Sequence, residues 1–169
     1  MYAPRRRPRA QQHRGGRVVV AFGSPLSGTS TALRILHEES RMHTELLDVA
    51  DEDDWFGTAE KHAAQGAVVL VDAPMTAEVV QGIHDAGLVQ PATGALVRFW
   101  ITNNEALRRA KELARTDIDH AHLERWRGRI PQIDERARIL SLPYYMIPNE
   151  RSGLDAAVAE LARKAGVIY

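Results

Sequence analysis

The fold is decided by the stretch RVVVAFGSPLSGTSTALRIL, residues 17–36, in which an apolar run passes through a glycine-bounded loop into a helical pattern. The run VVVAF, residues 18–22, is continuous and rich in β-branched residues, which predicts a buried strand of a parallel sheet. The apolar spacing after the loop predicts a helix over roughly residues 28–40. The stretch therefore predicts a strand, a tight loop and a helix in direct succession.

The same alternation continues along the rest of the chain. Further strands are expected over residues 44–49, 67–72, 94–102 and 144–148, with helical patterns between and after them. We expect Asn103 or Asn104 to cap one of these helices, and Pro131 to break the helical stretch after residue 117 into two pieces. Strands that alternate with helices predict an α/β domain with a five-stranded, mostly parallel sheet flanked by helices.

The composition is that of an ordinary globular protein, with 44% apolar and 26% charged residues. A chain of 169 residues suits one domain. No apolar run approaches the roughly 18 residues of a membrane span, and none follows the basic N-terminus as in a signal peptide. The absence of cysteine excludes disulfides and thiolate metal sites. A cytoplasmic protein without a membrane partner is therefore expected, and the sequence does not indicate its oligomeric state.

The N-terminal segment has a charge of its own. The net charge is zero, but the first 17 residues hold six arginines and no acid. Residues 1–16 are predicted to be a disordered basic tail, which leaves residues 17–169 as the folded domain. The tail is either a solubilising segment or an arm that binds the phosphates of nucleic acid.

The loop between Gly23 and Gly28 has the chemistry of a phosphate-binding loop. Glycines at both ends let the backbone wrap around anionic oxygens, and the first amides of the following helix attract an anion. Ser30 stands where such loops place the hydroxyl that binds magnesium, but Thr29 replaces the usual lysine. The alternative is a serine-rich turn that binds nothing. The predicted phosphate contacts are Gly23, Ser24, Ser27, Gly28, Thr29, Ser30 and Thr31.

Aspartates at strand ends are candidates for the chemistry. Asp72 ends the strand at 67–72, beside the loop in such a sheet, where with Ser30 it could hold Mg²⁺. It could also simply start a turn. Asp48 and Asp51 follow the second strand and could accept a proton from an attacking hydroxyl. Alternatively, the acids at 51–54 only form the acidic first turn of a helix.

Arginine is the available substitute for the missing lysine. The chain has 19 arginines and three lysines, and none of the lysines is near the loop in sequence. Each arginine of the later helices is either a solvated surface charge or a cation that reaches the phosphates. These arginines are Arg108, Arg109, Arg115, Arg125, Arg127 and Arg129.

Residues 17–165 resemble the P-loop nucleoside and nucleotide kinases, most closely the guanylate-kinase-like branch, with a degenerate loop. Residues 103–130 look like the helix and arginine-bearing lid of that family, and residues 142–161 like its last strand and closing helix. The resemblance implies a single-domain, three-layer P-loop NTPase fold that binds ATP or another NTP with Mg²⁺. It further implies Arg115 and Arg125 as lid arginines, and Pro148 and Asn149 near the nucleotide base.

The chain departs from guanylate kinases on the acceptor side. Only 26 residues, 41–66, separate the first helix from the third strand, so the insertion that binds guanylate is missing. A phosphotransferase with another acceptor is expected: a nucleotide, a nucleoside or a modified DNA base, as in viral kinases that phosphorylate modified bases. The alternative is an inactive P-loop scaffold that binds nucleic acid or a protein partner through its arginine-rich tail.

Overall fold

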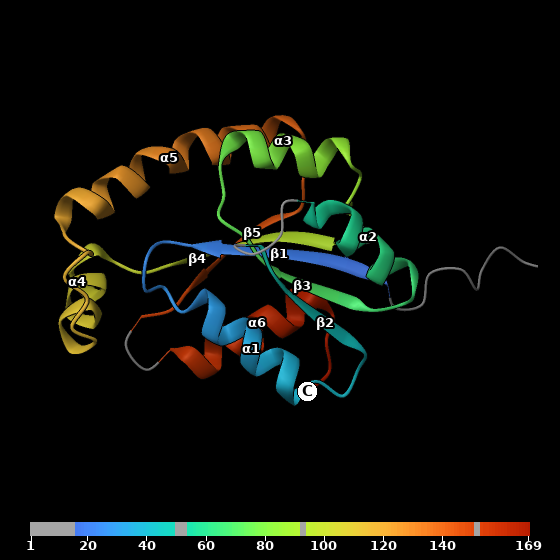
Figure 1. The fold of residues 1–169 in the computed structure, drawn as a ribbon, viewed down its shortest axis with the longest axis horizontal. Coiled ribbons are helices and arrows are strands. Elements are labelled where there is room, and N and C mark those ends of the chain that lie inside the picture. Colours follow the sequence, from blue (N-terminus) through green and yellow to red (C-terminus); the bar gives the residue numbers. More distant parts are fainter. Residues whose placement is uncertain (1–15, 50–53, 92–93, 151–152) are drawn as a thin grey trace, which may run out of the picture.

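The computed structural model of the protein describes residues 16–49, 54–91, 94–150 and 153–169. In these ranges five strands alternate with six helices (Figure 1). The strands are β1 (Arg17–Gly23), β2 (Thr44–Asp48), β3 (Val68–Asp72), β4 (Gly94–Trp100) and β5 (Tyr144–Pro148). The helices are α1 (Thr29–Glu39), α2 (Trp55–Ala64), α3 (Ala77–Asp85), α4 (Asn103–Glu112), α5 (His120–Ile139) and α6 (Leu154–Ala165).

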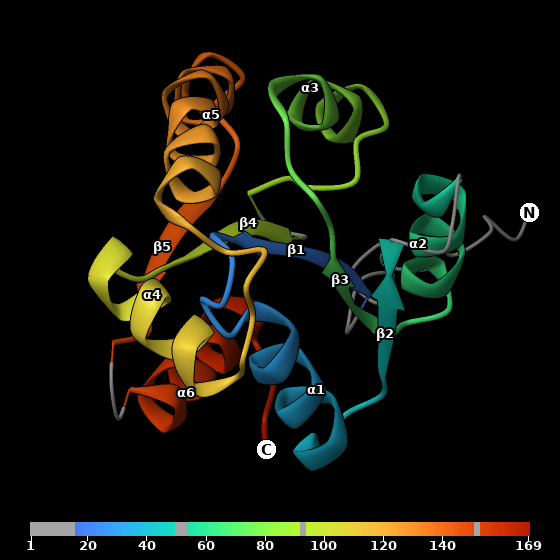
Figure 2. The same cartoon turned by 60° about the vertical axis from the view of Figure 1, so that its left-hand side comes forward.

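The strands form one parallel sheet in the order β2–β3–β1–β4–β5, with β1 at its centre. Val18, Val20 and Phe22 of β1 face α2, α3 and α5, whereas Val19 and Ala21 face α1 and α6. Figure 2 shows these two groups of helices on opposite faces of the sheet. Because both faces are covered, consecutive β1 residues are buried. The predicted three-layer α/β fold with a five-stranded sheet is confirmed.

The carboxyl end of the sheet opens between β1 and β3. In the parallel register Ala21 pairs with Asp72, and Asp72 pairs with Asp48 of β2. The chain leaves β1 toward α1 on one face and leaves β3 toward α3 on the other face. Such a divergence of connections creates a crevice at the strand ends, where ligands of open α/β sheets bind.

Two expectations about helix boundaries are wrong. Pro131 lies inside the single helix α5. An interior proline costs about 3 kcal/mol, but Leu123 before it and Ile133 after it are both buried, so packing on both sides of the proline stabilises one continuous helix. The cap of α4 is Thr102, whose side chain accepts from the Glu105 amide at 3.2 Å, rather than either asparagine.

The predicted basic tail, except for Gly16, and Asp51 lie outside the described residues. Within the described ranges, no helix is both long enough and apolar enough to cross a membrane.

Candidate functional site

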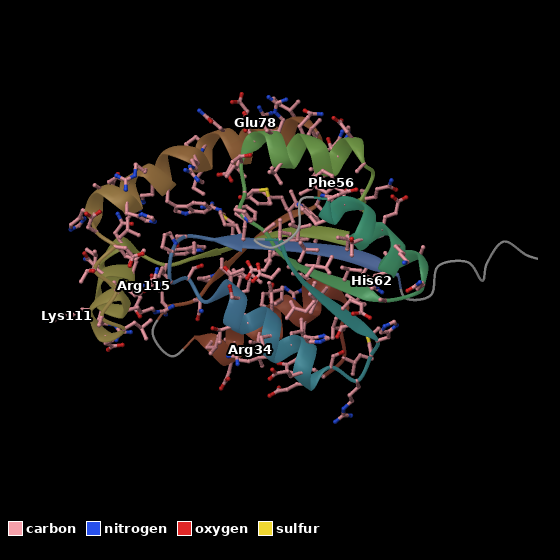
Figure 3. All side chains as sticks on the ribbon, viewed as in Figure 1. Arg34, Phe56, His62, Glu78, Lys111 and Arg115 are labelled. Atoms are coloured by element: carbon pink, nitrogen blue, oxygen red, sulfur yellow. The ribbon has the colours of Figure 1, made fainter. Side chains whose placement is uncertain are left out.

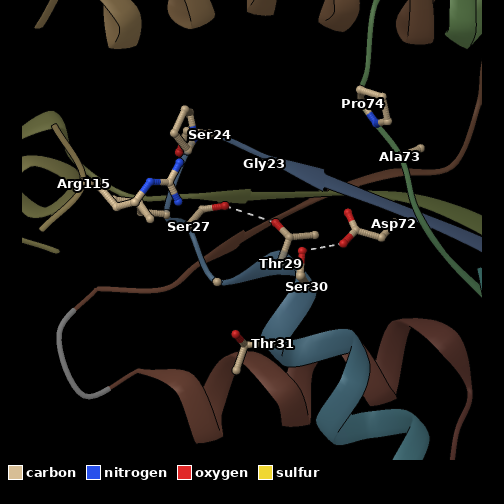
Figure 4. A pocket seen from close by; sticks show the side chains of 13 residues that line it. Gly23, Ser24, Ser27, Thr29, Ser30, Thr31, Asp72, Ala73, Pro74 and Arg115 are labelled. Atoms are coloured by element: carbon tan, nitrogen blue, oxygen red, sulfur yellow. Dashed lines mark hydrogen bonds between the residues drawn. The ribbon is translucent and has the colours of Figure 1, made fainter. Parts of the chain in front are cut away.

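The loop that joins β1 to α1 surrounds an open cavity of about 400 Å³. This loop cavity is lined by residues 23–31, by residues 72–74 after β3, and by Arg115 (Figure 4). The structure therefore brings together the loop residues and Asp72, which the sequence predicted as one site, with one of the two predicted lid arginines.

The loop presents the amino-terminal end of α1 to the cavity. Gly28, at φ 83°, precedes the helix, and it has no side chain to cap the first amides. Within the loop the Ser27 amide donates to the Ser24 carbonyl at 3.1 Å, which closes a tight turn through Leu26 at φ 63°. Uncapped amides at a helix start carry partial positive charge. The cavity is therefore suited to an anion.

Gly23 is required by the closeness of the loop to its own hydroxyls. A Cβ at this position would lie 2.1 Å from Ser27 Oγ and 2.5 Å from Thr29 Oγ1. These two hydroxyls are hydrogen-bonded to each other at 3.1 Å, and both side chains are buried. Thr29, at the position of the usual lysine, is thus fixed inside the loop wall.

Two side chains hold the loop from outside the cavity. Asn149, only 2% exposed, donates from Nδ2 to the Ser27 carbonyl at 2.8 Å. Because the carbonyl and the next amide of a trans peptide point in opposite directions, this bond turns the Gly28 amide away from Asn149. Arg109 donates to the Leu26 carbonyl at 2.9 Å and to the Asn149 carbonyl at 2.6 Å. Asn149 and Arg109 thus fix the carbonyls of Ser27 and Leu26, which would otherwise be free to turn toward an anion.

Glu105 anchors this arrangement from α4. Its carboxylate is 5% exposed, and it accepts hydrogen bonds from Arg108 and Arg109. These guanidinium groups lower the pKa of Glu105 to about 2. From the sequence, Arg109 was expected to be either a solvated surface charge or a cation that reaches the phosphates, and Glu105 was not singled out. The signal was present, because residues four apart on a helix can form an ion pair.

Ser30 and Asp72 meet at the edge of the loop cavity, where the Ser30 hydroxyl donates to Asp72 Oδ2 (Figure 4). Burial raises the pKa of Asp72; the Ser30 hydrogen bond opposes this effect, and the negative charge of Asp48 adds to it. A hydroxyl beside a carboxylate offers the hard oxygen ligands that Mg²⁺ requires. The donor set thus fits a magnesium ion.

The raised pKa of Asp72 predicts that its ionised side chain lowers the free energy of unfolding at neutral pH. Folding favours its protonated form, so stability decreases as pH rises from the ordinary value of 3.8 through the raised pKa, and the loss persists above it. We expect Asp72→Asn to unfold at a higher temperature than the wild type at pH 7, with no difference below pH 3.8. Thermal unfolding followed by circular dichroism measures this. Asp155→Asn, at an exposed position of α6, is the control and should give no increase. A lower Tm of Asp72→Asn at pH 7 would contradict the argument.

Arg115 is the one cation among the described residues that line the loop cavity. Figure 3 shows it near the loop, whereas Arg34 lies along α1 and Lys111 on the outer side of α4. Arg115 forms a bidentate ion pair with Asp117, at 2.9 and 2.8 Å, and both side chains are about half exposed. The bonds to Arg115 lower the pKa of Asp117 to about 2.

The structure places other predicted residues outside the lining of the loop cavity. Asp48 ends β2 beside Asp72 and is exposed. Arg125 lies on the exposed surface of α5. Asn149 lies behind the loop and lines a different cavity of about 350 Å³, named here the α4 cavity. Its lining includes Thr31, Arg108, Arg109 and Leu154.

Comparison with known proteins identifies similar structures but no similar sequence. No protein-family model matches the chain, and no curated protein matches it. YorR from Bacillus subtilis, solved with phosphorylated GDP, superimposes with a TM-score of 0.59 at 11% identity, over 86% of this chain and 94% of that one. A gluconokinase from Sinorhizobium meliloti superimposes with a TM-score of 0.58 at 16% identity, over 90% of this chain and 95% of that one. A deoxyadenosine kinase from M. mycoides with bound dATP superimposes with a TM-score of 0.53 at 12% identity, over 89% of this chain and 99% of that one.

All three identities are too low to transfer an activity, and what they establish is a shared backbone. The match covers nearly all of each solved chain, so it is not limited to a single β–α unit. The chain therefore shares the P-loop NTPase fold of these solved structures, which is the fold class that the sequence predicted.

Proposed function

We propose that the protein binds a nucleoside triphosphate with Mg²⁺ in the loop cavity and transfers its terminal phosphoryl group. The observation that carries this proposal is the convergence on one cavity of the uncapped α1 amides, the Ser30–Asp72 pair and Arg115. Phosphoryl transfer requires from a protein a site for the phosphate anion, ligands for a hard cation and a further positive charge.

Each group has a separate task in this proposal. The amides at Gly28 and the start of α1 bind the inner phosphates, and Ser30 and Asp72 provide oxygen ligands for the metal. The bound Mg²⁺ would neutralise charge on the phosphate oxygens. Arg115 supplies the positive charge of the absent lysine. A cation about 4 Å from a phosphate charge contributes roughly 4 kcal/mol at an effective dielectric near 20.

The nucleotide base and the phosphoryl acceptor would lie on opposite sides of the phosphates. We place the nucleotide base in the α4 cavity, where Arg109 donates to the Asn149 carbonyl and Leu154 of α6 lines the wall. The acceptor would approach from the β2 side, where Asp48 stands next to Asp72 and could accept the proton of its hydroxyl. The guanylate-kinase-like branch suggests a nucleotide, a nucleoside or a modified DNA base as the acceptor. Cytoplasmic location and a nucleic-acid contact through residues 1–16 belong to the same proposal.

Thermal shift with ATP tests the proposal. At a concentration about 100 times Kd, a ligand stabilises the folded state by about 2.7 kcal/mol, which is about 5–10 °C for a chain of this size. We expect this shift to depend on Mg²⁺, and Ser30→Ala to abolish the Mg²⁺-dependent part. Ser40→Ala, at the far end of α1, is the control. A shift with single-stranded DNA that disappears without residues 1–16, and none with ATP, would instead support the inactive scaffold.

Restoring the lysine provides a second test of the site. Thr29→Lys extends a cation into the loop cavity at the cost of the bond between Thr29 and Ser27. We expect triphosphate affinity to rise about tenfold by isothermal titration. Thr29→Met, which has a similar stem without charge, should give no gain. Unchanged or weaker binding by the lysine variant would contradict this expectation and would mean that a second cation finds no place beside Arg115.

A further inference from the structure

A cavity of about 250 Å³ lies between α5 and the carboxyl end of β4. This α5 cavity is separate from the α4 cavity but shares Ser24 with the loop cavity. Its lining includes Arg98 and Trp100 of β4, Trp126 of α5 and Met146 of β5. None of these four residues has a task in the proposed phosphoryl transfer.

Arg98 is a largely buried cation whose hydrogen bonds are incomplete. Its side chain is 15% exposed, and its Nε is buried without a partner in the described part of the chain. Its Nη2 donates to the sulfur of Met146 at 2.7 Å, and a thioether is a weak acceptor. Asp134 Oδ2 forms an ion pair with Arg98 at 3.7 Å, which is longer than a hydrogen bond, and the Tyr144 side chain interacts with the same guanidinium. A guanidinium in this situation gains free energy from a further acceptor.

Ser24 adds a second unused polar atom to the same wall. Its Oγ is buried and has no partner among the described residues. A serine hydroxyl can donate, and a guanidinium only donates. The two groups together therefore call for an acceptor, and a carboxylate is the acceptor that binds a guanidinium most strongly. Arg127 at the rim adds a further positive charge.

The remaining walls are flat and apolar. Trp126 is held edge-on against Phe22, with ring centroids 6.5 Å apart and planes at 63°, so its position is fixed by the core. Trp100 is 37% exposed and Met146 is 57% exposed. Exposed apolar side chains around a cavity with few polar groups are typical of small-molecule sites. Indole rings favour another ring, stacked or edge-on.

We propose that the α5 cavity binds a small aromatic carboxylate. The carboxylate accepts from Arg98 and Ser24, and the ring packs against Trp126 and Trp100. Met146, which is exposed on the edge strand β5, moves off the guanidinium to make room. This site stands apart from the proposed function, because it needs neither a nucleotide nor a metal.

Three probes of similar size and different charge test the proposal: benzoate, benzamide and benzylamine. Binding is measured without nucleotide by saturation-transfer NMR and by quenching of tryptophan fluorescence. We expect benzoate to bind with Kd on the order of 1 mM or below, within reach of a ligand of this size. Benzamide should bind more weakly, and benzylamine should not bind. Equal binding of benzoate and benzylamine, or no binding of benzoate at about 10 mM, would overturn the proposal.

Variants locate the binding in the α5 cavity. Arg98→Gln should weaken benzoate binding about tenfold or more, and Arg98→Lys should restore part of it. Arg129→Gln, on the exposed surface of α5, is the matched control and should bind as the wild type does. If Arg98→Gln fails to fold by circular dichroism, Trp126→Phe gives the second readout, with a reduced fluorescence response to benzoate. Wild-type affinity in a folded Arg98→Gln would show that the carboxylate does not bind there.

Discussion

Replacing Arg115 by alanine is expected to slow phosphoryl transfer by roughly 10³-fold, the lower end of the effect of an arginine that stabilises transferring phosphate. The reason is geometric: Arg115 is the cation that lines the loop cavity in the described structure, and Thr29 offers no charge there. Nucleotide affinity should change far less than kcat, because backbone amides still bind the inner phosphates. The measurement is ATP turnover in single-turnover mode, with binding measured separately by titration.

The matched control is Arg125→Ala, since the resemblance assigned both arginines to the lid but only Arg115 lines the cavity. We expect Arg125→Ala to retain wild-type turnover. The ion pair between Arg115 and Asp117 does not argue against a role in catalysis, because exposed pairs contribute little and can be exchanged for a phosphate contact. Equal losses in the two variants, or none in either, would remove Arg115 from the mechanism.

The sequence predicted the features that depend on local pattern. Most strands are apolar runs and most helices have a periodic apolar pattern, so the alternation of elements along the chain and the parallel sheet followed. Asp72 could be placed beside the loop because parallel strands end at one edge of a sheet, and the register of Ala21 with Asp72 agrees. Local pattern also suits the start of α5, where the Asp119 side chain accepts from the His122 amide at 2.8 Å and no other capping residue follows it directly.

The contacts behind the loop could not be predicted in this way. Arg109 reaches Leu26 across 83 positions of sequence, and Asn149 reaches Ser27 across 122. Both bonds end on a backbone carbonyl, which is the same in every residue and therefore leaves no pattern in the sequence. For the same reason, the sequence could not show which of the six candidate arginines lines the loop cavity. It depends on the turn between α4 and α5, where Ala114 has φ 52°.

These hidden contacts give the second large expected effect, that of Gly28→Ala. A Cβ on Gly28 would lie 2.4 Å from Asn149 Nδ2. The side-chain amide of Asn149 must therefore leave the Ser27 carbonyl, to which it donates at 2.8 Å. The peptide is then free to turn, and the Gly28 amide no longer keeps its direction. We expect ADP affinity to fall about 100-fold, which corresponds to the loss of one or two hydrogen bonds to a charged group. Titration calorimetry measures it.

Gly66→Ala separates this contact from backbone strain. Gly66 has φ 89°, close to the 83° of Gly28, but a Cβ there would meet nothing within 4 Å. Both variants should therefore lose the roughly 1 kcal/mol of stability that a left-handed alanine costs, and only Gly28→Ala should lose nucleotide affinity as well. Asn149→Ala removes the same hydrogen bond without strain, so its affinity should fall in the same direction. If ADP binds equally to the Gly28 and Gly66 variants, then Asn149 does not orient the loop, and the amides of α1 bind the anion without support from β5.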